Sequence, residues 1–314
     1  MDKLLSKEEI EELVEETFDH LSQNRFKMGL SSAQNLYEII PSDFRSATYL
    51  AWAYLENTKP NYALEYADLS VRLGKGNPLP HLYRGFILMR LGIYNNALID
   101  LDQVLKTSID FAARAHHLKA RCFASLEKYS EALDEIELAL KYERSTNKNL
   151  NKTREWFKNA AKSKGGFLSK LLTKEINSLI KEAEESLKLK EFWYTNWCLK
   201  QIKTNNVSVD VIKKIKILEL ELMYSLFQFK NAIQKANEIN EEFKDDQQFQ
   251  IIFNKLIKAE KQIGEAKREE IVANNLPKEK TNLSLSKRRQ SACLTKAAAQ
   301  GFEPRLIRSE RIVR

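Results

Sequence analysis

The sequence predicts an all-α fold in which helical hairpins follow one another as a solenoid, and two observations carry this prediction. Residues 78–146 repeat a pattern of small and bulky side chains at an offset of 34 to 35 residues. A period in this range, with two helical patterns in each unit, is typical of helical repeat proteins. The 314 residues include only 9 Gly and 6 Pro, which suits long helices and disfavours an all-β fold with many turns.

Small residues recur where two antiparallel helices must approach each other closely. In the first helix of a hairpin this position holds Gly85 and, 35 residues later, Ala120. In the second helix it holds Ala63, Ala97 and Ala132, at steps of 34 and 35 residues. A single hairpin cannot bury its apolar face alone, so hairpins stack and share a core. Because four units keep this register, we prefer repeats to the alternative of unrelated hairpins with a chance alanine match.

The first repeat follows from local signals. Ser6 and Glu9 have the spacing of a capping box, which predicts the start of the first helix. A second helix is expected from about residue 26 to residue 40, where the next residue, Pro41, ends it. Gly29 lies 34 residues before the small residue of the next unit, so this hairpin is the first of four repeats. The second repeat covers roughly 44–77.

Beyond residue 143 the pattern weakens. Trp156 and Phe157 lie in a short helical segment, 151–162, which is expected to cover the exposed apolar end of the repeats. Gly165 and Gly166 then indicate a joint. Two weaker hairpins and a helix from about 247 to 263 follow, which makes about six repeats in two blocks. The expected domains are 1–162 (four repeats and a capping helix), 163–175 (joint), 176–270 (a second, degenerate block with its own capping helix) and 271–314 (a basic, disordered tail).

The net charge of +8 is concentrated in the tail. From Ile271 to Arg314 there are ten Lys and Arg against three Glu, whereas the other 270 residues carry 41 basic and 40 acidic side chains. The body is therefore electrically balanced, and a basic overall composition does not by itself indicate nucleic-acid binding by the whole chain.

The spacing of small residues resembles the tetratricopeptide repeat (TPR), which places a small residue early in its first helix and an alanine early in its second. The stretch from Leu82 to Leu140 is also similar to the TPR region of the J-protein co-chaperone P58IPK, although the His-Pro-Asp sequence of a J domain is absent. The resemblance implies a superhelix whose first helices line a concave face that binds polypeptides.

Projecting the first helices onto that face gives a candidate peptide-binding groove. It is expected to be an exposed apolar trough with cations at its far end, because exposed apolar surface of this kind marks binding sites. The alternative is that these residues are core, since helix boundaries inferred from sequence are off by two residues or more. The Lys, Asn and Arg set of TPR proteins that grip a carboxylate is not matched. The groove residues are Val14, Phe18, Trp52, Leu82, Phe86, Met89, Arg90, Arg114 and Arg121.

No pattern in the sequence indicates catalysis. The four His and three Cys have no metal-ligand or redox spacing. No glycine-rich phosphate loop and no nucleophile elbow is present. We therefore expect no enzyme, no metal and no cofactor.

The tail holds one sharper motif. Lys287, Arg288 and Arg289 precede Ser291, an arrangement that basophilic kinases prefer, so Ser291 is a candidate phosphorylation site. The alternatives are a nuclear-import or anionic-surface patch and an ordinary solvated tail. Since no apolar run is long enough to span a membrane and the start lacks a signal peptide, the expected location is cytoplasmic, with the nucleus as the alternative.

Two functions are compatible with these features. The first is a non-enzymatic TPR adaptor, co-chaperone-like, which binds polypeptide segments in the apolar groove. The alternative is an assembly scaffold that binds one dedicated protein partner, with the basic tail docking to nucleic acid or to an acidic partner.

Overall fold

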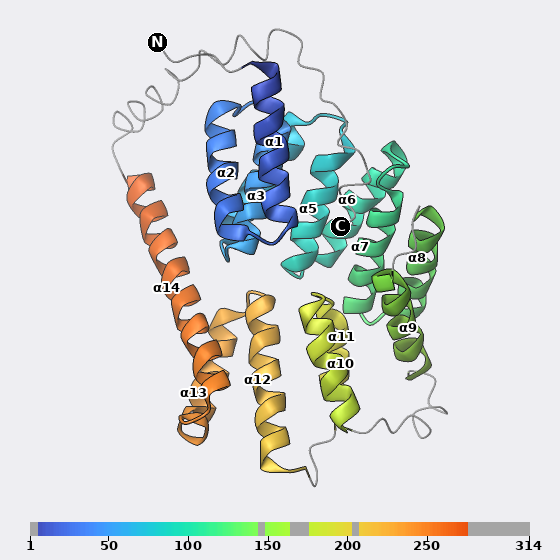
Figure 1. Ribbon diagram of the computed structural model, residues 1–314, viewed down its shortest axis with the longest axis vertical. Coiled ribbons are helices and arrows are strands. Elements are labelled where there is room, and N and C mark those ends of the chain that lie inside the picture. Colours follow the sequence, from blue (N-terminus) through green and yellow to red (C-terminus); the bar gives the residue numbers. More distant parts are fainter. Residues whose placement is uncertain (1–5, 144–147, 164–175, 203–206, 276–314) are drawn as a thin grey trace. The chain divides into compact units, whose positions relative to one another are not determined.

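The computed structural model describes residues 6–143, 148–163, 176–202 and 207–275 (Figure 1). Over these residues it contains α-helices and no strand, so the expected all-α fold of successive helices is confirmed. The first helices of six hairpins are α1 (Lys7–Ser22), α3 (Phe44–Glu56), α5 (Pro78–Arg90), α7 (Ala112–Ser125), α10 (Ile176–Lys188) and α12 (Val209–Ser225). The second helices are α2 (Phe26–Ile39), α4 (Pro60–Leu73), α6 (Tyr94–Thr107), α8 (Tyr129–Tyr142), α11 (Phe192–Gln201) and α13 (Phe229–Phe243). Two further helices are α9 (Lys148–Ser163) and α14 (Gln247–Asn275).

Each hairpin turns through one residue with a positive φ, and in the first four hairpins these residues follow the same steps as the small side chains of the second helices. In five of the hairpins the amide that follows it donates to the carbonyl five residues back, over 2.8 to 2.9 Å, which is the backbone arrangement of a Schellman cap. The first four turn residues follow at steps of 34, 34 and 35, and the last two are 37 apart. The turn residues are Asn24, Thr58, Gly92, Glu127, Lys190 and Phe227.

The backbone contacts divide the chain within α5 and α6. Of the described residues, 6–88, 99–112 and 265–275 form unit 1, and 89–98 and 113–264 form unit 2. The joint expected at 163–175 falls largely outside the described residues. The helices on either side of it, α9 and α10, contribute to one core in unit 2. The two units are described one at a time.

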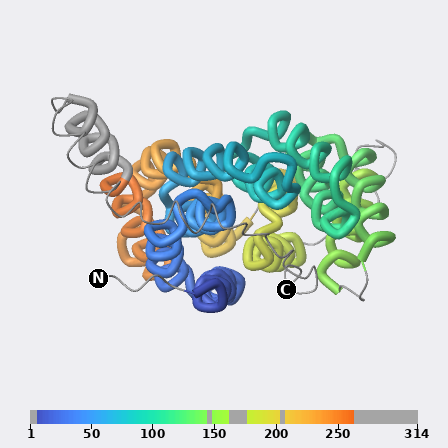
Figure 2. Tube along the Cα trace, turned by 90° about the horizontal axis from the view of Figure 1, so that it is seen from above, coloured from blue at the N-terminus to red at the C-terminus, as the bar shows by residue number. Residues whose placement is uncertain are grey.

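In unit 1, α1 packs against α2 and α3, α2 against α3, and α3 against α4. The two views show α1 and α2 lying side by side (Figure 1, Figure 2). The expected capping box begins α1, because the Ser6 amide donates to Glu9 over 2.6 Å and the Glu9 amide donates to the Ser6 hydroxyl over 3.1 Å. The small residues expected between the helices, Ala63 and Gly29, are buried.

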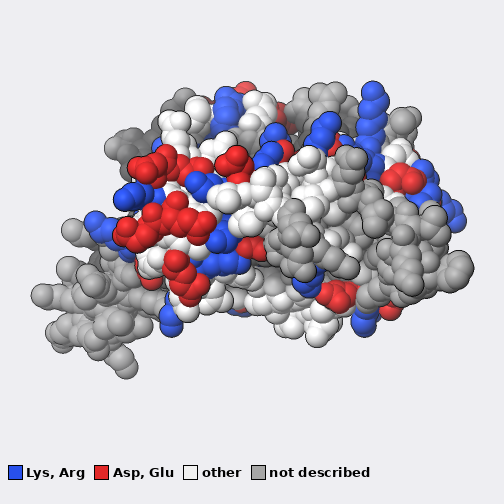
Figure 3. All heavy atoms as spheres, turned by 90° about the horizontal axis from the view of Figure 1, so that it is seen from below, with Lys and Arg blue, Asp and Glu red and all other residues white. Residues whose placement is uncertain are grey.

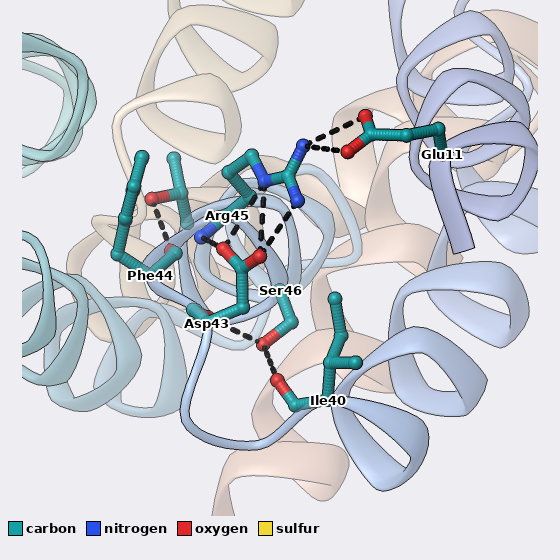
Figure 4. Close-up of polar contacts among 7 residues, drawn as sticks. Glu11, Ile40, Asp43, Phe44, Arg45 and Ser46 are labelled. Carbon is teal, nitrogen blue, oxygen red and sulfur yellow. Dashed lines mark hydrogen bonds and ion pairs between the residues drawn. The ribbon is translucent and has the colours of Figure 1, made fainter. Parts of the chain in front are cut away.

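A buried arginine joins α1 to α3 in unit 1. Arg45 is 1 % exposed, and its Nη1 donates to both carboxylate oxygens of Glu11 over 2.9 and 3.1 Å (Figure 4). Its Nη2 and Nε donate to Asp43, which caps α3, over 2.7 and 3.1 Å. The Ser46 hydroxyl meets the Ile40 and Asp43 carbonyls. These contacts hold the turn before α3 against α1 and α2.

One set of polar contacts recurs at the repeat spacing, once in each unit. In unit 1 the His81 Nδ1 lies 2.7 Å from Asp100 Oδ1, and Arg84 also binds this carboxylate. In unit 2 the His116 Nδ1 lies 2.6 Å from Glu135 Oε2, and Lys119 binds that carboxylate over 2.7 Å. Histidine, cation and carboxylate are each displaced by 35 residues, so the two hairpins share partly buried polar contacts as well as small residues.

Hydrophobic side chains of the described part of unit 2 gather in a larger and a smaller cluster. The larger one joins α7, α8 and α9 to α10, α11 and the start of α12, and Trp156 and Phe157 of α9 lie within it. Their rings stack on α11, with Phe157 and Trp193 centroids 4.4 Å apart and Trp156 and Tyr194 centroids 4.7 Å apart. The helix expected to cap the repeats therefore shares its apolar face with the next hairpin. The smaller cluster joins α12, α13 and α14.

The described surface carries both signs of charge. Figure 3 shows a group of acidic side chains with basic side chains beside them, in keeping with the balanced body of the sequence. Among the described residues, no helix is long and apolar enough to cross a membrane.

Candidate functional site

The structure places most of the predicted groove residues of unit 1 inside the protein. Val14, Phe18 and Leu82 keep 5 % or less of their surface exposed, whereas Trp52 and Phe86 are half-buried. The expectation of an exposed apolar trough is therefore wrong for the first three residues. They belong to the core, as the alternative interpretation of the sequence had it.

The physical reason is that aromatic rings from successive first helices pack on one another. The Phe18 ring lies 6.0 Å from that of Tyr49 and 6.2 Å from that of Trp52, measured between centroids. Tyr83 of α5 extends the row, 5.4 Å from Trp52 and 6.4 Å from Tyr49. Residues that were projected onto an open face thus fill the contacts between α1, α3 and α5, where they exclude water.

Three other predicted groove residues lie together in unit 2. Met89, Arg90 and Arg121 line an open cavity of about 80 Å³, which we call the turn pocket. Met89 and Arg90 are buried, so Met89 also departs from the expected exposed position. Arg114 is partly buried on α7 and does not line the pocket. The remaining lining residues are Tyr94, Ala124, Ser125, Glu127, Tyr129, Phe192, Trp193, Asn196, Trp197, Lys200 and Leu226.

The turn pocket is formed where hairpins reverse direction. The end of α5 and start of α6 supply one wall, and the turn between α7 and α8 supplies the next. One face of α11 forms a third wall, and Leu226 adds the turn before α13. Because the same backbone turn recurs in these hairpins, the repeat itself brings their ends to one place.

Aromatic side chains of α11 make the apolar wall, and the core behind fixes their orientation. The Trp193 ring stacks on Phe157 at 4.4 Å and lies 6.3 Å from Tyr129. The Trp197 ring stacks on Tyr194 at 5.2 Å. Trp193 and Trp197 are 6 % and 8 % exposed, so only a small part of each ring reaches the pocket. A wall held in this way is pre-organised for a ligand.

Arg90 is positioned by aromatic rings. Its guanidinium carbon lies 4.9 Å from the centroid of Phe192 and 5.7 Å from that of Phe227, and Nη2 reaches the Ser225 carbonyl over 3.5 Å. Contacts of this type stabilise a cation through the electron-rich face of the ring, more so where water is excluded. The charge is therefore fixed at the end of α5 instead of moving on a long side chain.

Arg121 is positioned by a buried carboxylate. Its Nε lies 3.1 Å from Glu191 Oε2, and its Nη2 donates to the Lys190 carbonyl. Glu191 is 5 % exposed and also accepts from Trp193 Nε1 over 3.0 Å, with His117 Nε2 at 3.3 Å. Burial by itself raises the pKa of Glu191, but the Arg121 charge and the bonds from His117 and Trp193 outweigh it. The pKa lies below its ordinary value, so the carboxylate stays ionised and keeps Arg121 in place.

The rim of the turn pocket carries an exposed ion pair. Lys200 Nζ lies 2.9 Å from Glu127 Oε1, and the two side chains are 57 % and 52 % exposed. Burial and the nearby Glu127 charge raise the pKa of Tyr129 to about 12, so its hydroxyl remains a neutral donor at physiological pH.

The turn pocket offers hydrogen-bond donors, positive charge and apolar surface, which are features suited to binding a ligand. Among the described residues, no group of three or more His, Cys, Asp or Glu could hold a metal ion. The buried Cys122 lies near the pocket on α7, and burial raises its pKa to about 12, so it stays a thiol and is a poor nucleophile. The expectation that the chain is no enzyme stays a prediction.

Most of the aromatic wall was missed by the sequence reasoning, which looked for the site on the first helices. A signal was available in α11, where Phe192, Trp193, Tyr194 and Trp197 fall within six residues. Two of the four Trp of the whole chain are among them. The candidate phosphorylation site Ser291 lies outside the described residues.

No family model matches the sequence, and no curated protein sequence matches it. Solved structures of TPR proteins are similar in fold. Pseudomonas aeruginosa PilF has a TM-score of 0.40 and 12 % identity over 78 % of this chain and 97 % of its own. A TPR protein from Parabacteroides merdae has a TM-score of 0.39 and 12 % identity over 79 % and 98 %. The P58(IPK) TPR domain has a TM-score of 0.28 and 15 % identity over 81 % and 98 %. At these identities and TM-scores, the likenesses carry no argument about the function or the partner of this chain.

Proposed function

We propose that the chain is a non-enzymatic protein-interaction scaffold, in which the turn pocket binds a segment of a partner protein. The observation that carries this proposal is the composition of the pocket. Trp193, Trp197, Tyr129 and two arginines meet in one partly enclosed place, and Trp, Tyr and Arg are the residues that dominate the binding energy of protein interfaces.

The size of the turn pocket supports a peptide side chain as its occupant. Pockets for cofactors and other small molecules measure about 300–1,000 Å³, whereas this cavity holds about 80 Å³. One side chain of a partner fills such a space, and the exposed rim with Asn196 and Lys200 is free to contact the backbone on either side.

A co-chaperone-like function, with capture of apolar segments from many clients, is the second candidate. Trp52 and Phe86 of unit 1 favour it, because they remain half-buried among the predicted groove residues. Their core neighbours Phe18 and Leu82 are closed off, so this surface is smaller than the sequence suggested.

The test is quantitative affinity capture with the full-length chain carrying Asn196→Trp. Asn196 is exposed on α11 at the mouth of the pocket, so the indole fills the mouth without changing the core. Asn237→Trp, at an exposed position of α13, is the matched control. We expect one stoichiometric partner to be lost with Asn196→Trp and retained with Asn237→Trp.

Loss of many unrelated clients with Trp52→Ala/Phe86→Ser, and no effect of Asn196→Trp, would favour the co-chaperone-like function instead. A partner set that is the same for wild type and Asn196→Trp would contradict the role of the turn pocket.

A further inference from the structure

The charges around the turn pocket are not balanced. Arg90, Arg121 and Lys200 line it, and Glu127 is the one acidic lining residue. When Glu191, which binds Arg121 from behind, is included, cations still outnumber carboxylates by one. A concave site with an excess of positive charge attracts ligands of the opposite sign.

Two of the three cations are held in place before any ligand arrives. Arg90 lies against Phe192 and Phe227, and Arg121 is bound by Glu191. Little side-chain entropy is lost when such groups meet a partner, and this raises affinity. A guanidinium also presents several donors in one plane, which suits a carboxylate.

Lys200 supplies the third cation from the rim, where it pairs with Glu127 over 2.9 Å. Both side chains are more than half exposed, and an ion pair of this kind contributes little to folding. A carboxylate from outside can replace that of Glu127 on Lys200 at small cost. Glu127 therefore occupies the position of an acidic ligand, and it competes with one.

The pocket lining also has apolar residues. Trp193, Trp197, Met89 and Leu226 are among them. A ligand that fits the site thus combines an apolar side chain, which fills the cavity, with an adjacent negative charge at its edge, where Lys200 is exposed.

We infer that the turn pocket binds an acidic segment of a partner polypeptide, in which an Asp or Glu side chain meets Arg121 and Lys200 and a neighbouring apolar side chain lies on Trp193 and Trp197. This inference rests on the proposed function and specifies the partner chemistry of the same site. Charge complementarity argues for this occupant, since an acidic segment balances the excess of one positive charge around the pocket, whereas a neutral or basic segment does not.

The test measures fluorescence anisotropy of a short labelled peptide of Glu, Leu and Phe with the full-length chain. Its twin carries Gln in place of every Glu. A labelled single-stranded oligonucleotide serves as a third probe. We expect the Glu peptide to bind about tenfold more tightly than the Gln twin and more tightly than the oligonucleotide, because charge-assisted hydrogen bonds are roughly twice as strong as neutral ones.

Two opposite variants at the rim make the test specific. Lys200→Gln should weaken binding of the Glu peptide several-fold, and Glu127→Gln should strengthen it about two- to fivefold by removing the competing carboxylate. The matched control is Lys244→Gln, which removes one exposed positive charge at the opposite end of α13 from Leu226. Circular dichroism confirms that each variant folds, and the exposed positions make this straightforward.

Equal binding of the Glu and Gln peptides overturns the inference, as does an equal effect of Lys200→Gln and Lys244→Gln. Tighter binding of the oligonucleotide, with the same dependence on Lys200, assigns the pocket to nucleic acid and also overturns it. If Asn196→Trp still removes the cellular partner in these cases, the proposed function stands and the acidic partner chemistry alone fails.

Discussion

Arg45 in unit 1 and Arg121 in unit 2 both lie on the first helix of a hairpin and bind carboxylate, but Arg45 is buried and Arg121 is partly exposed. Arg45 directs Nε and Nη2 to Asp43 and Nη1 to Glu11, and 1 % of it is exposed. Arg121 meets Glu191 with Nε, and its side chain is 11 % exposed where it lines the turn pocket. The same residue type thus holds helices together in unit 1 and presents charge to a cavity in unit 2.

The largest effect on stability is expected for Arg45, because all three nitrogens of its guanidinium donate to carboxylate oxygens. Arg45→Met should lower the free energy of unfolding by about 3–5 kcal/mol, because it leaves Asp43 and Glu11 without their cation in a partly buried place. Urea denaturation followed by far-UV circular dichroism measures this change. Arg45→Lys keeps the charge but loses the planar fork, so it should recover part of the stability. A loss below about 1 kcal/mol for Arg45→Met would mean that the contacts of Arg45 contribute no more to stability than a surface ion pair does.

The corresponding contact of unit 2, between Arg121 and Glu191, is tested by replacing Glu191. Glu191→Gln should cost about 1–3 kcal/mol near neutral pH, since Arg121 loses a buried charged partner. The pKa of Glu191 is lowered in the folded protein, so its contribution to stability is present above the unfolded pKa, near 4.3, and is lost as the pH falls through the lower folded pKa. The difference in unfolding free energy between wild type and variant should therefore shrink on acidification.

Urea denaturation at a series of pH values between neutral and acidic measures that difference. Glu127→Gln is the matched control, because it removes the same charge at an exposed position and should change stability by less than about 1 kcal/mol. A difference between wild type and Glu191→Gln that stays constant down to low pH would mean that Glu191 acts by packing alone.

Some features of the two units could be predicted from the sequence, and others could not. Helix positions and the hairpin period follow from local signals such as the Ser6–Glu9 capping box and the recurring small residues, and the structure agrees with them. The side of a helix that faces solvent does not follow, because a shift of one residue turns a helix by about 100°. Phe18 and Leu82 illustrate this: their type and spacing suit a groove and a core equally, and tertiary packing puts them in the core.

The turn pocket could not be predicted from the sequence for a different reason. Met89 and Arg121 were chosen as part of a surface on successive first helices, yet the pocket also needs α11 and the turn before α13. Glu191 and Lys200 are about 70 residues away from Arg121 and Glu127 along the chain. Nothing in a 34- to 35-residue period indicates which of the distant hairpins will meet, so the partners of the arginines appear only in the folded chain.

The smallest effects on the free energy of unfolding are expected from substitutions in the hairpin turns. Thr58 has a φ of 58° and Glu127 a φ of 59°, where the hairpin between them has Gly92. A β-branched residue in this region is a genuine outlier, and glycine adopts it freely at the cost of more entropy in the unfolded chain. Thr58→Gly should therefore raise the unfolding free energy by about 0.5–1 kcal/mol. Asn24→Gly should raise it less, because Asn tolerates the left-handed region better than Thr.

Glu127→Gly places the same backbone change beside the turn pocket. It relieves the turn as Thr58→Gly does, but it also removes the ion pair with Lys200, so its effect on stability should be smaller than that of Thr58→Gly. Thermal unfolding of the three glycine variants gives their order directly. If Glu127→Gly were the most stabilising of them, the rim carboxylate would be a burden to the folded protein. In that case competition with an acidic ligand, rather than the fold, would be the better account of why the turn carries a glutamate.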